Sequence, residues 1–188
     1  MVRLGIFASG EGSNAQNFIN YFRNRKDVTI SLIVSTKKEA GVIQKAIDEQ
    51  IPDLILDKES FYNTDLVLNE LKAKVDFIVL AGFLWMIPPN IIKAYEGKMV
   101  NIHPALLPKY GGKGMFGKKV HEAVIHNKEK ESGMTIHYVN ENYDEGKIIF
   151  QGKCVVEPSD TPEALEKKIH ELEYEFYPKV VEEILQKQ

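Results

Sequence analysis

The chain has 188 residues, of which 44% are hydrophobic and 27% charged, and its formal net charge is -3. This composition is typical of one compact globular domain and excludes a disordered chain. No basic run is long enough to follow a nucleic-acid backbone, and no apolar run is long enough to span a membrane, so neither partner is expected. The single cysteine, Cys154, excludes an internal disulfide, and the short apolar start does not resemble a signal peptide, so a cytoplasmic protein is expected.

Strand-length apolar runs alternate with helical patterns through the first half of the chain. Such alternation predicts an α/β fold, with a Rossmann-like, mainly parallel sheet and helices on both faces. The expected strands are 4–8, 28–34, 54–56, 77–81 and 99–102, and the expected helices are 14–22, 40–49, 64–74 and 88–95.

The second half has a different character. Residues 109–119 contain four glycines and four lysines and are expected to form a loop before a short helix over 120–127. Two apolar runs, 134–139 and 147–156, flank a polar turn and predict an antiparallel C-terminal strand pair. A last helix is expected to begin at Thr161, and Pro178 is expected to kink or restart it.

The first loop has the residues of an anion-binding turn. In Ser9-Gly10-Glu11-Gly12-Ser13-Asn14, the glycines allow a tight turn in which successive N–H groups converge at the start of a helix. Ser13 and Asn14 can donate further hydrogen bonds. The pattern is neither a Walker A motif nor a complete dinucleotide fingerprint, so it predicts binding of one phosphate. The alternative is a plain tight turn in which Ser13 or Asn14 caps the helix.

A second polar motif, Asn101-Ile102-His103-Pro104, ends the fifth expected strand. Ligands of open parallel sheets bind beyond the carboxyl ends of the strands, and the two-residue period places Asn101 and His103 on one side. The Asn101 amide can donate to an oxygen that gains charge, and His103 can give or take a proton near neutral pH. The alternative is a buried hydrogen-bonded pair that only shapes the loop.

Four motifs, in this order along the chain, together resemble the phosphoribosylglycinamide formyltransferase family of purine biosynthesis. Each motif is moderately specific alone, and the set covers nearly the whole chain. They are Ser9-Gly10-x-Gly12-Ser13-Asn14, Leu80-Ala81-Gly82-Phe83, Asn101-Ile102-His103-Pro104-x-Leu106-Leu107-Pro108 and Asp144-x-Gly146-x-Ile148-Ile149-x-Gln151.

The resemblance implies a reaction and its site. A formyl group would pass from 10-formyltetrahydrofolate, as co-substrate and without a metal, to the amine of N1-(5-phospho-D-ribosyl)glycinamide. One formyltransferase domain would cover 1–188, with phosphate binding in 1–100 and catalysis and folate binding in 101–188. The implied residues are Asn101, His103 and Asp144 for catalysis, Gly12, Ser13, Asn14 and Glu173 for the ribonucleotide, and Leu84, Trp85, Met86, Ile87 and Asn101 for the folate.

The chemistry of formyl transfer suits the implied trio. The reaction passes through a tetrahedral oxyanion, for which the Asn101 amide is the candidate donor, and a carboxylate at Asp144 is expected to raise the pKa of His103. Asp144 can instead be a turn aspartate that bonds its own backbone, and Glu145 is a rival acid. His137 can point into the site or into the core, and His170 can meet the acceptor or solvent.

Several departures and alternatives stay open. Many family members carry an arginine where Leu84-Trp85 stands here, and the loop 109–119 is longer than usual. We expect this Gly/Lys loop to be mobile and to close over the folate. Formyltetrahydrofolate hydrolase and methionyl-tRNA formyltransferase are rival activities, although each usually adds a further domain. A silent nucleotide-binding module, or a metal site of His103, His137 and Asp144, are more distant alternatives. The oligomeric state is left open.

Overall fold

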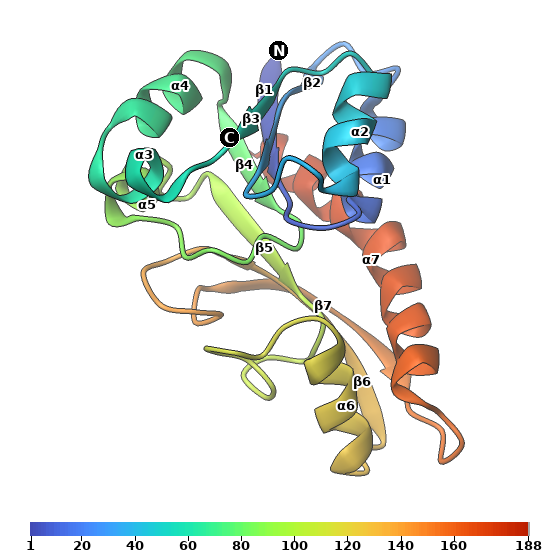
Figure 1. The fold of residues 1–188 in the computed structure, drawn as a ribbon. Coiled ribbons are helices and arrows are strands. Elements are labelled where there is room, and N and C mark those ends of the chain that lie inside the picture. The colour runs from blue at the N-terminus through green and yellow to red at the C-terminus, as the bar shows by residue number, and fades with distance from the viewer. Residues whose placement is uncertain (188) are drawn as a thin grey trace. The chain divides into compact units, whose positions relative to one another are not determined.

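The computed structural model describes residues 1–187 and divides into two compact units, Met1–Val100 and the part from Asn101 on (Figure 1). The expected α/β class and the antiparallel C-terminal strand pair are both confirmed. Most strands and helices begin or end within one to three residues of the expected positions.

The first unit is built on a parallel sheet with the strand order β3-β2-β1-β4. This order is that of the first half of a doubly wound dinucleotide-binding fold, so the Rossmann-like expectation is confirmed. All four residues of β4 are buried, as a strand covered on both faces requires. The strands are β1 (Val2–Phe7), β2 (Val28–Ser35), β3 (Asp53–Ile55) and β4 (Phe77–Leu80).

Helices cover both faces of this sheet. α1 and α2 pack on β2, and α4 packs on β1 from the opposite side (Figure 1). The helices are α1 (Ser13–Phe22), α2 (Gly41–Asp48), α3 (Lys58–Asn63), α4 (Leu66–Lys74) and α5 (Pro89–Ala94).

Of these helices, α3 was not expected from the sequence. Asp57 caps it, because its carboxylate accepts a 2.9 Å hydrogen bond from the Ser60 N–H. That Asp-x-x-Ser spacing was the available signal.

The second unit opens with the end of β5 (Met99–His103), which lies beside β6 (Glu131–Tyr138) and then β7 (Ile148–Val155). β6 and β7 are antiparallel, and α6 (Lys118–His126) and α7 (Pro162–Leu185) accompany them. The register contains a bulge, since Ile136 pairs with Phe150 whereas the next residue, His137, pairs with Ile148. Bulges of this kind re-aim side chains near functional sites.

The expectation that Pro178 restarts the last helix is wrong, since α7 continues through it. Proline removes one backbone donor, but the helix is held by packing as well as by its own hydrogen bonds. Tyr177, Pro178 and Val181 are all buried, so this turn of the helix is fixed by its contacts rather than by local propensity.

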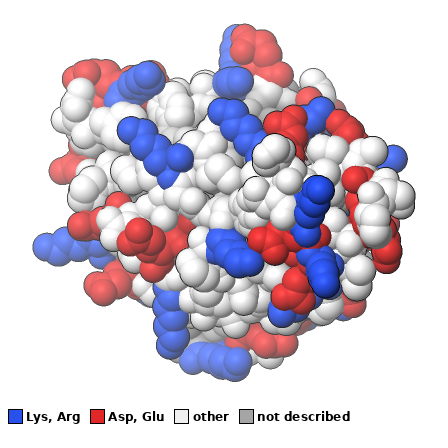
Figure 2. Space-filling model, turned by 90° about the horizontal axis from the view of Figure 1, so that it is seen from below, with Lys and Arg blue, Asp and Glu red and all other residues white. Residues whose placement is uncertain are grey.

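Charges of both signs are interspersed on the face that Figure 2 shows, and no extended basic area stands out. Within residues 1–187, no helix is both long enough and apolar enough to cross a membrane.

Candidate active site

The first loop leaves the start of α1 open. Gly12 is the residue before the helix and has a left-handed backbone with φ of 72°. Ser13 is the first helical residue and is exposed, and the cap position is held by Gly12, which has no side chain with which to cap α1. The alternative in which Ser13 or Asn14 serves as the cap is therefore wrong. The N–H groups of a first turn, together with the helix dipole, are suited to an anion.

Replacing Gly12 with alanine is expected to destabilise the chain by about 2–4 kcal/mol and to weaken phosphate binding. An added Cβ would lie 2.6 Å from the Cβ of Val42 and 2.9 Å from its Cα, in a backbone region that side chains rarely adopt. Urea unfolding and titration with a ribose 5-phosphate compound measure the two effects.

Gly10→Ala is the matched control, because nothing lies within 4 Å of its added Cβ. Equal stability and equal binding in the two variants would contradict this account of the loop.

The loop after β1 lies beside the segment after β4. The Ser9 N–H donates to the Gly82 carbonyl over 3.1 Å, and the Leu84 N–H donates to Ser9 Oγ over 3.4 Å. In the order β3-β2-β1-β4, successive strands are added on one side of β1 up to β3, and β4 is then added on its other side. Ligands of such sheets bind at this switch point, between β1 and β4. The predicted phosphate loop and the start of the predicted folate segment therefore meet at the position where this fold binds ligands.

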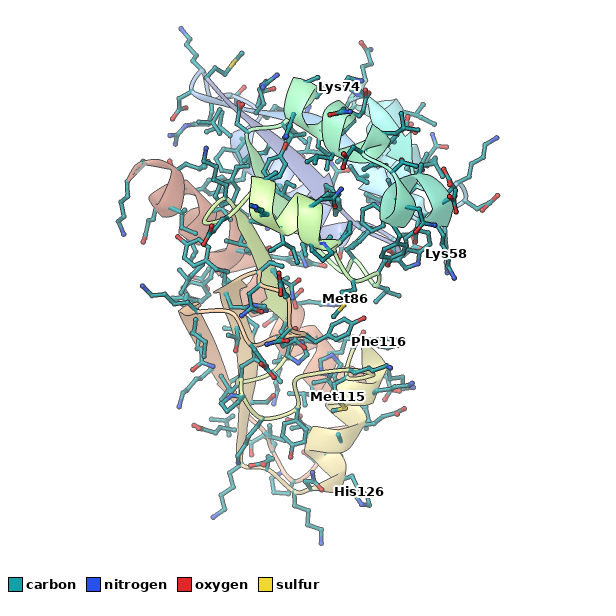
Figure 3. The ribbon with its side chains drawn as sticks, turned by 90° about the vertical axis from the view of Figure 1, so that its left-hand side faces the viewer. Lys58, Lys74, Met86, Met115, Phe116 and His126 are labelled. Carbon is teal, nitrogen blue, oxygen red and sulfur yellow. The ribbon has the colours of Figure 1, made fainter. Side chains whose placement is uncertain are left out.

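The predicted folate segment is largely exposed. Leu84 is 50% and Met86 37% exposed, whereas Ile87 is almost fully buried, and Met86 projects outward from its loop (Figure 3). Trp85 packs against Tyr62 of α3, with ring centroids 6.0 Å apart, and Lys58 Nζ lies 6.0 Å from the centre of the Trp85 ring. This aromatic neighbour was not expected from the sequence, because α3 was not expected.

The second unit brings the predicted catalytic trio together. Asn101 and His103 come from β5 and Asp144 from the turn between β6 and β7. Asp144 Oδ1 lies 3.5 Å from Asn101 Nδ2, and Asp144 Oδ2 lies 3.5 Å from His103 Nδ1. The His103 side chain is 4% exposed and that of Asp144 12%. Because side chains alternate along a strand with a period of two, Asn101 and His103 of β5 both lie beside the Asp144 carboxylate.

Contacts from outside its own turn hold Asp144. The Gly112 N–H donates to its Oδ2 over 2.9 Å. The turn-type hydrogen bond is made by Asn140, whose Oδ1 accepts from the Asn142 N–H over 3.0 Å. Gly146 approaches the Tyr138 carbonyl so closely that no Cβ fits, which folds the turn back onto the end of β6. The structure therefore favours a role for Asp144 beside Asn101 and His103 over the alternative of a simple turn residue.

His137, whose position the sequence left open, belongs to this cluster. Its Nε2 lies 3.2 Å from Asn101 Nδ2 and 3.6 Å from Asp144 Oδ1, and its Nδ1 lies 2.8 Å from the Tyr138 carbonyl oxygen. A carbonyl only accepts hydrogen bonds, so Nδ1 carries a proton, and Nε2 is the nitrogen that accepts from the Asn101 NH₂ group. This orients the Asn101 amide with its NH₂ group toward the cluster.

A backbone carbonyl also fixes which nitrogen of His103 carries the proton. Its Nε2 lies 2.7 Å from the Tyr110 carbonyl oxygen, so Nε2 carries the proton of the neutral ring. Nδ1 then presents its lone pair on the side of Asp144.

The pKa of His103 differs from the expectation. Burial lowers the pKa of His103 below its ordinary value, and this outweighs Asp144 and the Tyr110 carbonyl, which both raise it. For Asp144, burial is the largest influence and raises the pKa, but the contact with His137, the positive charge that His103 gains on protonation and the Gly112 N–H together lower it. The cluster therefore holds a neutral imidazole beside an ionised carboxylate near neutral pH.

The chain that leaves β5 is fixed by two polar side chains of β6 and β7. Thr135 Oγ1 donates to the Ala105 carbonyl over 2.6 Å and accepts from the Leu107 N–H over 3.0 Å. Gln151 Nε2 donates to the Leu107 carbonyl over 3.0 Å. These bonds connect the Leu106-Leu107-Pro108 segment to Gln151, which lies far along the chain.

Replacing Thr135 with valine is expected to lower the free energy of unfolding by about 2–3 kcal/mol, because it leaves buried backbone groups at Ala105 and Leu107 unpaired. Urea denaturation measures the change. Thr135→Ser, which keeps the hydroxyl, is expected to lose less, and an equal loss in both variants would mean that the methyl group matters instead.

The remaining candidates lie on α6 and α7. Glu173 is buried, and burial raises the pKa of Tyr177 one turn further on, with Glu173 adding to the effect. The His170 ring stacks on Tyr174 with centroids 5.8 Å apart. His121 is buried, which lowers its pKa. Across the described part of the chain, no group of three or more His, Cys, Asp or Glu side chains is arranged to hold a metal ion.

Comparisons with known proteins agree with these motifs. A family model described as "Formyl transferase" matches residues 2–181. A chloroplastic phosphoribosylglycinamide formyltransferase of Arabidopsis thaliana is 40% identical, covering 95% of this chain and 64% of its own. A second plant relative, from Vigna unguiculata, has 60% of its length covered, so this chain spans less than two thirds of either plant protein.

Bacterial proteins match over nearly their full length. The phosphoribosylglycinamide formyltransferase of Bacillus subtilis (strain 168) is 34% identical, with 98% of this chain and 95% of its own covered. The crystal structure of phosphoribosylglycinamide formyltransferase from Bacillus Halodurans has a TM-score of 0.87 at 36% identity, covering 97% of this chain and 95% of its own.

Proposed function

This chain belongs to the formyl transferase family, and we propose that it transfers the formyl group of 10-formyltetrahydrofolate to the amine of N1-(5-phospho-D-ribosyl)glycinamide in purine biosynthesis. Relatives and solved structures named phosphoribosylglycinamide formyltransferase support this reaction over the other activities of the family. The observation that carries the proposal is the cluster of Asn101, His103, His137 and Asp144, in which His103 Nδ1 lies 3.5 Å from the Asp144 carboxylate.

The proposed reaction forms one bond and breaks another. The acceptor amine attacks the formyl carbon and gives a tetrahedral oxyanion, and the bond from that carbon to N10 of the folate then breaks. His103 Nδ1 takes the proton that the amine loses and delivers it to N10. The imidazolium that forms in between lies 3.5 Å from Asp144, so the carboxylate stabilises the charged intermediate more than the resting state.

Asn101 is the proposed donor to the oxyanion. His137 holds its NH₂ group toward the cluster, and the second N–H makes only a long, 3.5 Å contact with Asp144 Oδ1. That N–H can turn to a developing negative oxygen without breaking a strong hydrogen bond. Losing such a donor typically costs about 3 kcal/mol of transition-state stabilisation.

The substrate-binding residues are likewise proposals. The turn at Gly12, Ser13 and Asn14 would bind the acceptor's phosphate, and Glu173 would meet its glycinamide end. Leu84, Trp85, Met86 and Ile87, with Asn101, would contact the folate, which acts as co-substrate without a metal.

The proposal also covers the domain organisation, the partners and the location. The chain acts as a single formyltransferase domain on small molecules, with no nucleic-acid or membrane partner and a cytoplasmic location, although two plant relatives are named chloroplastic.

The test is a turnover assay with purified protein, 10-formyltetrahydrofolate and glycinamide ribonucleotide. We expect tetrahydrofolate release that depends on the acceptor, with formylated product in equal amount. Release of formate without the acceptor would instead identify a formyltetrahydrofolate hydrolase. Absence of both reactions would contradict the proposed function.

A further inference from the structure

The backbone of one short loop, residues 110–112, forms hydrogen bonds to both His103 and Asp144. The Tyr110 carbonyl accepts a 2.7 Å hydrogen bond from His103 Nε2, and the Gly112 N–H donates a 2.9 Å hydrogen bond to Asp144 Oδ2. These two backbone groups are only two residues apart. The distance and orientation of imidazole and carboxylate therefore depend on the conformation of residues 110–112.

That conformation is unusual and needs support. Tyr110 has a φ of 58°, in the left-handed region that residues other than glycine seldom occupy. Such a backbone persists only where surrounding contacts fix it, and it often occurs at functional sites.

The phenol group of Tyr110 supplies those contacts. Its hydroxyl donates to Glu129 Oε1 over 2.9 Å and accepts from Asn127 Nδ2 over 2.9 Å. Lys109 Nζ also donates to Glu129 Oε1, over 3.0 Å. Asn127 and Glu129 follow directly after the end of α6, so the hydroxyl ties the loop to the end of that helix.

We propose that Tyr110 is a positioning residue whose hydroxyl, clamped between Glu129 and Asn127, fixes the carbonyl that keeps the His103 proton on Nε2 and so makes Nδ1 the nitrogen that acts in the reaction. This inference rests on the proposed function and extends it. Residues 110–112 then hold His103 and Asp144 in a fixed orientation. Closure over a ligand is left to the following residues, which include the exposed Phe116 next to α6 (Figure 3).

The groups around His103 determine what loss of the clamp does to its titration. Asp144 and the Tyr110 carbonyl raise the pKa of His103, while burial and the nearby His137 lower it. His121 of α6 also lies close enough for its pKa to be lowered by His103. Loosening the Tyr110 carbonyl removes one of the two raising influences, so the pKa of His103 is expected to fall further.

The decisive variant is Tyr110→Phe, which keeps the ring and removes the hydroxyl. In ¹⁵N NMR spectra of the free protein, assigned with His103→Asn, wild-type His103 is expected as the Nε2–H tautomer and the variant as a mixture of tautomers. In turnover, kcat is expected to fall about 3–10-fold while both KM values stay within about two-fold. The acid limb of the kcat profile is expected to move to lower pH.

Matched variants separate the clamp from general stability. Glu129→Gln keeps an acceptor for the hydroxyl and is expected to resemble the wild type, whereas Glu129→Ala is expected to resemble Tyr110→Phe. Lys109→Met removes the other contact of Glu129 and is expected to change neither the tautomer nor the pH profile.

A Tyr110→Phe protein with the wild-type tautomer and the wild-type pH profile would overturn the proposal. The NMR measurement needs no turnover. It therefore tests whether the Tyr110 hydroxyl controls the His103 tautomer even if the assay with the two substrates gives no product and the proposed function fails.

Discussion

Replacing His103 with alanine is expected to lower kcat about 10³-fold, within the range that general acid–base groups contribute, with both KM values within about three-fold. The neutral Nδ1 of His103 faces Asp144, and no other imidazole nitrogen of the cluster is free to take the proton, because His137 Nε2 accepts from Asn101. Steady-state kinetics with both substrates measure the loss.

The same variant tests the direction of the pKa shift. Burial lowers the pKa of His103, so the wild-type acid limb is expected below the ordinary value of about 6.5, with activity lost as the pH falls through it. The contribution of the His103 ring to the free energy of unfolding is fully present above about pH 6.5. It is lost as the pH falls towards the lowered pKa of the folded state, because the unfolded chain binds the proton more readily. Both effects are expected to disappear in His103→Ala.

His126→Ala is the control, since this exposed histidine ends α6 (Figure 3). It is expected to keep wild-type kinetics. His103→Ala also leaves the Tyr110 carbonyl without its donor, so circular dichroism must show that the protein is folded at the assay temperature. A folded His103→Ala protein with wild-type kcat would contradict the mechanism.

Replacing Asp144 with asparagine is expected to lower kcat about 10²–10³-fold with little change in KM. The imidazolium loses the charge that stabilises it, although asparagine can still accept from the Gly112 N–H. The charge of Asp144 raises the pKa of His103, so its removal is expected to shift the acid limb to still lower pH. A pH series of kcat measures both effects.

Glu145→Gln provides the matched control for Asp144→Asn. Glu145 is the neighbouring acid and is exposed in the same turn. It is expected to retain wild-type activity and the wild-type pH profile. If the Glu145 variant lost activity and the Asp144 variant kept it, the two carboxylates would have to exchange roles.

The sequence by itself determined much of this protein. Alternating apolar runs predicted the parallel strands of the first unit, and the spacing of Asn101 and His103 predicted that both side chains share one face of β5. The motifs predicted the family, and they include Asp144, which lies beside Asn101 and His103. These inferences succeeded because hydrophobic periodicity and strand-end motifs are local properties, readable over a few consecutive residues.

The tertiary structure alone decided how the side chains of the candidate site are arranged. It placed His137 in the cluster, assigned the His103 proton to Nε2 through the Tyr110 carbonyl, and showed that burial lowers the pKa of His103 where the sequence suggested a rise. It also carried α7 through Pro178. Each of these depends on desolvation, packing or hydrogen bonds between residues distant along the chain, and such contacts leave no local signal in the sequence.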